Sequence, residues 1–169
     1  MGMIGIFRRL ADSDLTSLLD NPTLVHAYLE QEEPAQGFGP FVELDVDKAW
    51  HGIHFLLTGT PWAGEAPWNF ALAGGSTIGD EEVGYGPVRG FTSRQVRDIA
   101  SALESLSPEE LSQRFDPKAM MEAEIYPEIW DRPTEEDDTR AYLTNYYGSL
   151  RDFIAGAAGS GEALLVYLS

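Results

Sequence analysis

The stretch ALLVYL, residues 163–168, is the segment on which the fold depends most. It is apolar throughout, and a short apolar run without alternation is typical of a strand buried on both faces of a sheet. The stretch GMIGIFR, residues 2–8, is a second apolar run and contains two β-branched isoleucines, so it also predicts a strand. We therefore expect these two segments to pair, with both chain termini in one small sheet.

Helices are expected between these two segments. A capping residue followed by a first-turn proline, or by Glu or Gln three residues later, predicts helix starts at Thr92, Ser107 and Asp116. A long helix is expected from about residue 135 to 157, with Tyr142, Tyr146, Leu150, Phe153 and Ala157 facing inward. The sequence contains no internal repeat and no low-complexity tract.

Residues 88–91 supply a third expected strand, and residues 31–40 and 60–87 are rich in glycine and proline and are expected to form loops. Three strands separated by long helical stretches predict an α+β fold. The expected architecture is a single compact domain over residues 1–169, with an about three-stranded sheet packed against several helices.

The charge balance is strongly acidic, with 11 Lys and Arg against 28 Asp and Glu and a formal net charge of −17. Such a surface repels phosphate backbones and anionic lipids, so we expect neither nucleic acid nor membrane as a partner. Two interpretations remain open: the acidity serves solubility, or it steers a basic protein partner. Residues 1–50 contain 9 acidic against 3 basic residues and residues 101–140 contain 12 against 4, so an acidic docking face is expected to be built from these two stretches.

The chain contains no cysteine, which excludes disulfides, a thiol nucleophile and thiolate metal sites. No apolar run approaches the roughly 18–20 residues that span a bilayer, and the N-terminal run is too short for a signal-peptide core. These features favour a soluble cytoplasmic protein. No cofactor is expected, and the oligomeric state is left open.

The most informative helix is DVDKAWHGIHFLLT, residues 45–58, with Asp45 at the N-cap and Gly59 as a left-handed C-cap. On a helical projection one arc is apolar and should face the core, and it includes Trp50 and Ile53. A polar strip borders this arc. Its members are Asp47, His51, His54 and Thr58.

This strip allows three interpretations. An aspartate four residues before a histidine can orient a general base, as Asp47 and His51 would. Asp47, His51 and His54 could instead ligate a divalent metal. The favoured interpretation is that these side chains cap, pair and hydrogen-bond at a semi-buried edge, because no HExxH or comparable second motif follows and His26 lies far away in sequence. We therefore assign no catalytic residue and no metal ligand.

Two further segments attract attention. The turn GGSTIG at residues 74–79 lacks the lysine of a phosphate-binding loop, so Gly74 and Gly75 are expected to shape the rim of a cleft. The stretch EAEIYPEIWDRP at residues 122–133 groups acids with Tyr126 and Trp130. Aromatic residues dominate binding hot spots, so this stretch is a possible docking surface, although burial of both rings beneath a surface loop is favoured.

Several blocks carry a family resemblance: MGMIGIF at the start, LDVDKAWHGIHFLLTG at 44–59, the GGSTIG turn, YGPVRGFT at 85–92 and EIYPEIW at 124–130. In this order and spacing the chain resembles the YfbM-like family of uncharacterised bacterial proteins over essentially its whole length. The resemblance implies a compact α+β domain and no particular activity. The family motif falls on Asp45, Asp47, Trp50, His51, His54, Thr58, Gly59, Tyr126 and Pro127.

The leading functional hypothesis is a non-enzymatic, acidic interaction module, an inhibitor- or immunity-like binder of a basic partner. The alternative is a small ligand-binding or hydrolase-like enzyme that uses the strip of Asp47, His51 and His54. A third possibility is a surface that acts only in a homodimer. The candidate binding residues are Asp45, Asp47, Trp50, His51, His54, Thr58, Gly74, Gly75, Tyr126 and Trp130.

Overall fold

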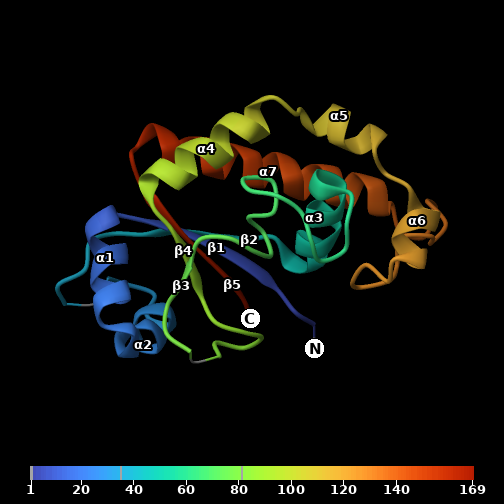
Figure 1. Ribbon diagram of the computed structural model, residues 1–169. Coiled ribbons are helices and arrows are strands. Elements are labelled where there is room, and N and C mark those ends of the chain that lie inside the picture. The colour runs from blue at the N-terminus through green and yellow to red at the C-terminus, as the bar shows by residue number, and fades with distance from the viewer. Residues whose placement is uncertain (1, 35, 81) are drawn as a thin grey trace.

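One antiparallel sheet runs through the centre of the computed structural model, which describes residues 2–34, 36–80 and 82–169 (Figure 1). In the described residues the sheet has five strands in the order β2-β1-β5-β4-β3. The central strand β5 pairs with β1 on one side and with β4 on the other. The strands are β1 Gly5–Leu10, β2 Val42–Asp45, β3 Ser76–Thr77, β4 Arg89–Phe91 and β5 Ala163–Leu168.

The α+β class is confirmed, but the expectation of about three strands is wrong. The two strands that were not expected are the outermost ones. Strand β2 has only four residues and β3 only two, and neither has the long apolar run that marked β5. The placement of both termini in the sheet is confirmed in part: β1 and β5 pair from Gly5–Leu168 to Leu10–Ala163, and residues 2–4 and Ser169 lie outside these strands.

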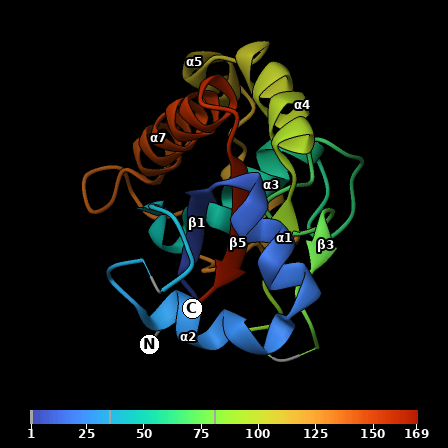
Figure 2. The same cartoon turned by 90° about the vertical axis from the view of Figure 1, so that its left-hand side faces the viewer.

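Helices cover both faces of the sheet (Figures 1 and 2). Helices α4 and α7 lie side by side above it together with α3, while α1 and α2 lie against the opposite face. Within the described ranges, none of the helices is both long enough and apolar enough to cross a membrane. The helices are α1 Asp12–Asp20, α2 Val25–Glu30, α3 Trp50–Thr58, α4 Ser93–Glu104, α5 Pro108–Gln113, α6 Pro117–Glu122 and α7 Thr139–Gly159.

Strand β5 joins two separate hydrophobic clusters. Leu164 and Val166 belong to the larger cluster beneath α3, α4 and α7, whereas Ala163 and Leu165 belong to the smaller cluster beneath α1 and α2. All four side chains are buried. An apolar residue at every position is therefore required, because successive side chains of a strand point to opposite faces.

The local helix signals behave as predicted. Complete capping boxes form at the start of α4, between Thr92 and Gln95, and at the start of α5, between Ser107 and Glu110. Helix α7 differs from expectation because it begins at Thr139 and buries a neighbouring face. Tyr142, Tyr146 and Phe153 are only half-buried. The fully buried side chains of α7 are Thr139, Leu143, Tyr147, Leu150, Ile154 and Ala157.

Candidate functional site

Helix α3 carries four of the ten candidate residues, and its apolar arc is buried as predicted. Gly59 ends the helix with a φ of 76°, and its N–H donates to the Phe55 carbonyl at 2.7 Å. The start differs from the prediction. Asp45 is the last residue of β2, and its Oδ1 accepts a hydrogen bond of 2.6 Å from the backbone N–H of Asp47. A short 3₁₀ turn at Asp47–Ala49 then leads into α3.

His51 has no solvent exposure, and both of its ring nitrogens are occupied. The Tyr126 backbone N–H donates to Nδ1 at 2.9 Å, and Nε2 lies 2.8 Å from the Pro61 carbonyl oxygen. A carbonyl can only accept, so Nε2 carries the proton. Burial lowers the pKa of His51, with the Pro61 carbonyl opposing this effect. His51 is therefore a neutral link that joins α3 to two loops.

His51 also stands in a row of four aromatic rings. The ring centroids of Tyr126 and Trp50 lie 5.5 Å apart, those of Trp50 and His51 5.1 Å, and those of His51 and Trp62 4.3 Å. Trp50 is buried, and its Nε1 donates to the Met3 carbonyl at 2.9 Å. Trp62 lies at the other end of the row and is 66% exposed. The exposed indole of Trp62 thus packs against the buried ring of His51, which itself packs against Trp50.

His54 and Thr58, the last two residues of the strip, lie next to the loop that follows α3. His54 has no solvent exposure, and neither ring nitrogen has a hydrogen-bond partner in the described residues. Burial is the main cause that lowers its pKa to about 4. The Thr58 hydroxyl lies 2.9 Å from the His54 carbonyl oxygen and 3.1 Å from that of Thr60. His54 thus faces the protein interior, whereas Thr58 is half-buried and lines a separate pocket of about 290 Å³ with Phe55 and Arg114.

Asp47 is not paired with His51. Its Oδ2 accepts a hydrogen bond of 2.7 Å from the Tyr142 hydroxyl, which itself accepts from the Lys48 N–H at 3.0 Å. Burial and, after it, Asp47 raise the pKa of Tyr142. The proposed orientation of a general base by Asp47 is therefore absent. Over the described ranges, no three His, Asp or Glu side chains gather as a metal site would require.

The two rings of the 122–133 stretch lie at different depths. Trp130 is 1% exposed, and its Nε1 donates to the Ile125 carbonyl at 2.7 Å, so it is a core residue. Tyr126 is half-buried, and its hydroxyl accepts from the Met3 N–H at 2.9 Å. Glu124 and Glu128 flank Tyr126 and are exposed, with positive φ angles of 54° and 61°. The acids of this stretch face solvent while its rings support the interior.

Gly74 and Gly75 line a cavity of about 310 Å³ that shares no lining residue with the strip. Its apolar walls include Phe91 and Ile99. Gly75 has a φ of 69°, and a Cβ there would lie 2.6 Å from the Gly90 carbonyl oxygen, so only glycine fits. Polar groups reach the cavity from three side chains, Asn69, Gln95 and Asp98.

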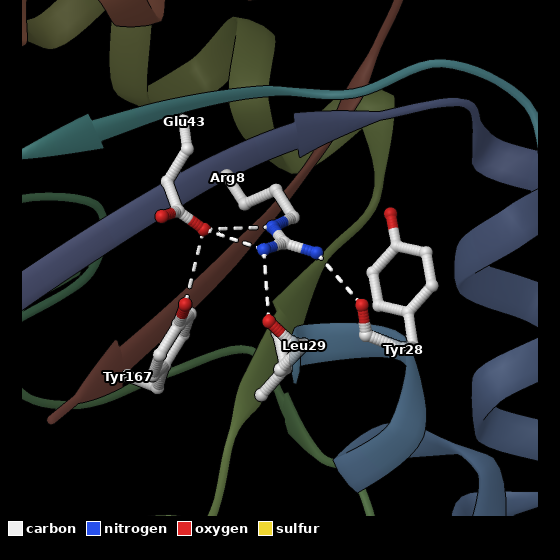
Figure 3. A network of polar contacts seen from close by, with 5 residues as sticks. All are labelled: Arg8, Tyr28, Leu29, Glu43 and Tyr167. Atoms are coloured by element: carbon white, nitrogen blue, oxygen red, sulfur yellow. Dashed lines mark hydrogen bonds and ion pairs between the residues drawn. The ribbon is translucent and has the colours of Figure 1, made fainter. Parts of the chain in front are cut away.

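A second polar cluster lies on the opposite face of the sheet and was not expected from the sequence (Figure 3). Arg8 is 2% exposed, and its guanidinium lies 2.7 Å from Glu43 Oε2. It also donates to the Tyr28 carbonyl at 3.0 Å and the Leu29 carbonyl at 3.3 Å. The Tyr167 hydroxyl donates to the same Glu43 oxygen at 3.0 Å. An arginine at an inward position of an apolar strand was the available signal.

Sequence reasoning also missed Trp62, the most exposed large hydrophobic side chain among the described residues. It lies in a segment rich in glycine and proline, where helical and strand periodicity give no information. The useful signal was an aromatic residue directly after Pro61 in an otherwise small and polar loop. Of the ten candidate residues, the structure brings Tyr126, Trp50 and His51 into one row of rings, and His51 is the member that contacts Trp62.

Comparison with known proteins gives consistent results. The model of a family described as a domain of unknown function, DUF1877, matches residues 1–167. The protein YfbM of Escherichia coli K12 is 30% identical over 138 residues, which cover 76% of this chain and 75% of YfbM. The crystal structure of YfbM, titled a protein of unknown function, superposes with a TM-score of 0.73 at 26% identity and covers 98% of this chain and 99% of its own.

Proposed function

The chain belongs to the DUF1877 family of unknown function, and we propose that it is a non-enzymatic module that binds a basic protein partner. The observation that carries this proposal is Trp62, 66% exposed on the ring of His51. Tryptophan is among the residues most enriched at binding hot spots.

The contacts that hold Trp62 in place support a binding role. His51 holds the Pro61 carbonyl at 2.8 Å, directly before Trp62 in the chain, and its own ring packs against the indole. A side chain that is already ordered loses less conformational entropy when a partner covers it. The loop from Pro61 onward is thus prepared for binding.

Acidic side chains accompany this indole. Glu65 is exposed on the same loop, and the turn with Glu124 and Glu128 is tied to it through His51, which accepts from the Tyr126 N–H. None of these three carboxylates has an ion pair among the described residues. An aromatic centre with a charged rim matches the anatomy of protein interfaces, and the formal net charge of −17 favours a basic partner.

The enzyme hypothesis based on the strip has less support from the geometry. A general base must reach a substrate proton, and His51 and His54 have no solvent exposure. His51 already uses both nitrogens for backbone groups. The same features suit a role in holding the binding loop.

The test is capture from a bacterial extract followed by measurement of the dissociation constant for the retained basic protein. Trp62→Ala should weaken binding by about 30-fold, since hot-spot truncations cost about 2 kcal/mol or more. Tyr85→Ala is the matched control, because Tyr85 is also exposed, at 50%, in a different loop. It should bind as the unchanged protein does.

Salt dependence provides the second criterion. A partner steered by the acidic surface should bind more weakly as ionic strength rises. Charge reversal of Glu65, Glu124 and Glu128, all exposed, should weaken binding and flatten that dependence. Equal capture by Trp62→Ala, or an acidic retained protein, would refute the proposal.

A second candidate is small-ligand binding in the cavity beside Gly74 and Gly75. Its apolar walls and three polar side chains have the composition of ligand sites, although about 310 Å³ is at the small end of their range. Asp98 makes no ion pair in the described residues, so a ligand with a cationic group and an apolar body would suit the cavity. Native mass spectrometry of gently purified protein would reveal a retained small molecule, and Gly74→Leu should abolish its retention.

A further inference from the structure

Strand β2 is an edge of the sheet, and half of its backbone groups face outward. It pairs with β1 in the register Phe7–Leu44 and Arg8–Glu43, and the Val46 N–H donates to the Gly5 carbonyl at 2.9 Å. Bonded and non-bonded pairs alternate in an antiparallel ladder. The backbone groups of Leu44 therefore face β1, and those of Glu43 and Asp45 face away. No described residue hydrogen-bonds to these outward groups.

The side chains of β2 alternate in chemistry. Residues that oppose each other in a sheet share a face, so Glu43 lies on the face of Arg8, and Asp45 on the same face. Val42 and Leu44 point to the other face. Val42 is 53% exposed, and among the large hydrophobic side chains of the described residues only Trp62 is more exposed. The edge thus presents acids on one side and aliphatic groups on the other.

The two acids differ in how far they are neutralised. Glu43 Oε2 is held by Arg8 of β1 at 2.7 Å and by Tyr167 of β5 at 3.0 Å, so these two contacts draw the carboxylate across the sheet toward β1 and β5 (Figure 3). Asp45 is exposed and has no ion pair in the described part of the chain. Its one recorded contact is the N–H of Asp47. Of the two β2 carboxylates, Asp45 is therefore the one that is free to pair with a cationic group of a partner.

Charge decides which occupant this edge favours. Free strand edges pair readily with other strands, and proteins commonly protect them with charged side chains. A second copy of this chain would bring the same acids and a formal net charge of −17, so it is repelled. A strand with basic side chains opposite Glu43 and Asp45 is attracted by the same groups.

We propose that the edge of β2 accepts an extended segment of a basic protein as an additional strand, with basic residues opposite Glu43 and Asp45 and aliphatic residues opposite Val42 and Leu44. This inference rests on the proposed function for the basic nature of the partner, and it adds a binding mode and a sequence pattern. Backbone hydrogen bonds would supply affinity and the alternating side chains specificity, as in other cases of strand addition.

The first probe is the capped peptide Lys-Val-Lys-Val-Lys-Val. Two control peptides separate the contributions: Lys-Ser-Lys-Ser-Lys-Ser keeps the charge, and an N-methylated form of the first peptide removes its strand-forming N–H groups. Amide NMR shifts of the full chain report the site and the affinity. The Lys-Val peptide should move the Glu43 and Asp45 amide signals and bind at least tenfold more tightly than either control.

The second probe is a pair of protein variants with the same charge change. Val42→Lys places a cation on the edge and should weaken binding of the Lys-Val peptide at least tenfold. Tyr85→Lys, at an exposed site in the loop before β4, should leave it unchanged. Thermal unfolding of each variant checks that the fold is retained, and the peptide controls do not depend on any variant.

The outcomes separate this inference from the proposed function. Equal affinity for the three peptides, or signal shifts spread over the acidic surface, would overturn strand addition while capture that depends on Trp62 could still hold. Peptide binding at β2 that persists in Trp62→Ala, together with undiminished partner capture by that variant, would retain the edge site and reject the Trp62 surface.

Discussion

Arg8 and Arg9 are neighbours on β1, yet they enter opposite faces of the sheet and meet different surroundings. The side chain of Arg8 is 3% exposed and bonds to Glu43 and to two backbone carbonyls. That of Arg9 is 18% exposed and lies at the rim, 2.6 Å from Glu162. The guanidinium of Arg8 is therefore buried in the protein interior, and that of Arg9 lies at the edge of the interior on the other face.

The two arginines differ because the two faces of the sheet are covered by different numbers of helices. Helices α3, α4 and α7, with one buried residue each from α5 and α6, cover the larger cluster. The buried polar groups on this side, among the described residues, are the neutral rings of His51 and His54 and the Thr139 hydroxyl. Two short helices cover the smaller cluster, and a charge lies within it, with Arg8 placed 3.9 Å from the Phe41 ring centroid. A small core can include a charge only where nearly every donor is satisfied.

The largest effect is expected when Arg8 is removed. Arg8→Ala leaves the Tyr28 and Leu29 carbonyls without this donor and leaves the Glu43 carboxylate, whose side chain is 35% exposed, with the Tyr167 hydroxyl. A buried acceptor left without its donor typically costs about 1–3 kcal/mol, so the two carbonyls together should lower the unfolding free energy by about 4 kcal/mol. Arg9→Ala is the control, and a partly exposed pair should cost roughly 1 kcal/mol. Similar losses for both variants in chemical denaturation would show that the two faces do not differ in this way.

The next effect concerns the larger face. His51→Ala removes two hydrogen bonds and a buried ring, which should lower the unfolding free energy by about 3 kcal/mol. It should also loosen Trp62, which fluorescence would report. His51→Phe keeps a ring and loses only the two bonds, so it should cost less. A fully stable His51→Ala variant would remove the proposed support of the binding loop.

The smallest effect appears only in acid. The pKa of His54 is about 4 in the folded chain, against about 6.5 when unfolded, so the unfolded chain binds more protons between these values. Stability from this group is present above pH 6.5 and lost as pH falls. Between pH 7 and pH 5 the loss should be about 2 kcal/mol. The variant His54→Leu should lack this part of the pH dependence, and parallel curves for both proteins would contradict it.

Short-range signals in this chain predicted the structure well. The capping boxes of α4 and α5 depend on residues three apart, and Gly59 and the run ALLVYL are equally local. Strand β2 was missed because four residues with two acids do not show strand periodicity clearly. Strand β2 is recognised only by its pairing with β1, and a local sequence pattern does not contain that information.

The candidate site shows the same limit. Helical periodicity placed His51 and His54 together on a border strip, and it could not show which loops lie over them. The chain covers them with Pro61 and Tyr126, which are 10 and 75 residues from His51. The predicted inward face of α7 was wrong at Tyr146, because the next residue, Tyr147, is the one that is buried. The two tyrosines are alike in sequence, and only packing against α4 and α5 distinguishes them.

The position of β5 has a consequence for how the chain acquires its structure. During synthesis β1 and β2 emerge early and β4 emerges much later, and these two parts of the sheet have no strand in common until residues 163–168 have been made. Each part must wait with an unpaired edge, and contacts so distant in sequence are slow to form. Folding of this sheet is therefore expected to finish only after β5 has left the ribosome, and a translational pause before residue 163 would prolong exposure of the two unpaired edges to chaperones and proteases.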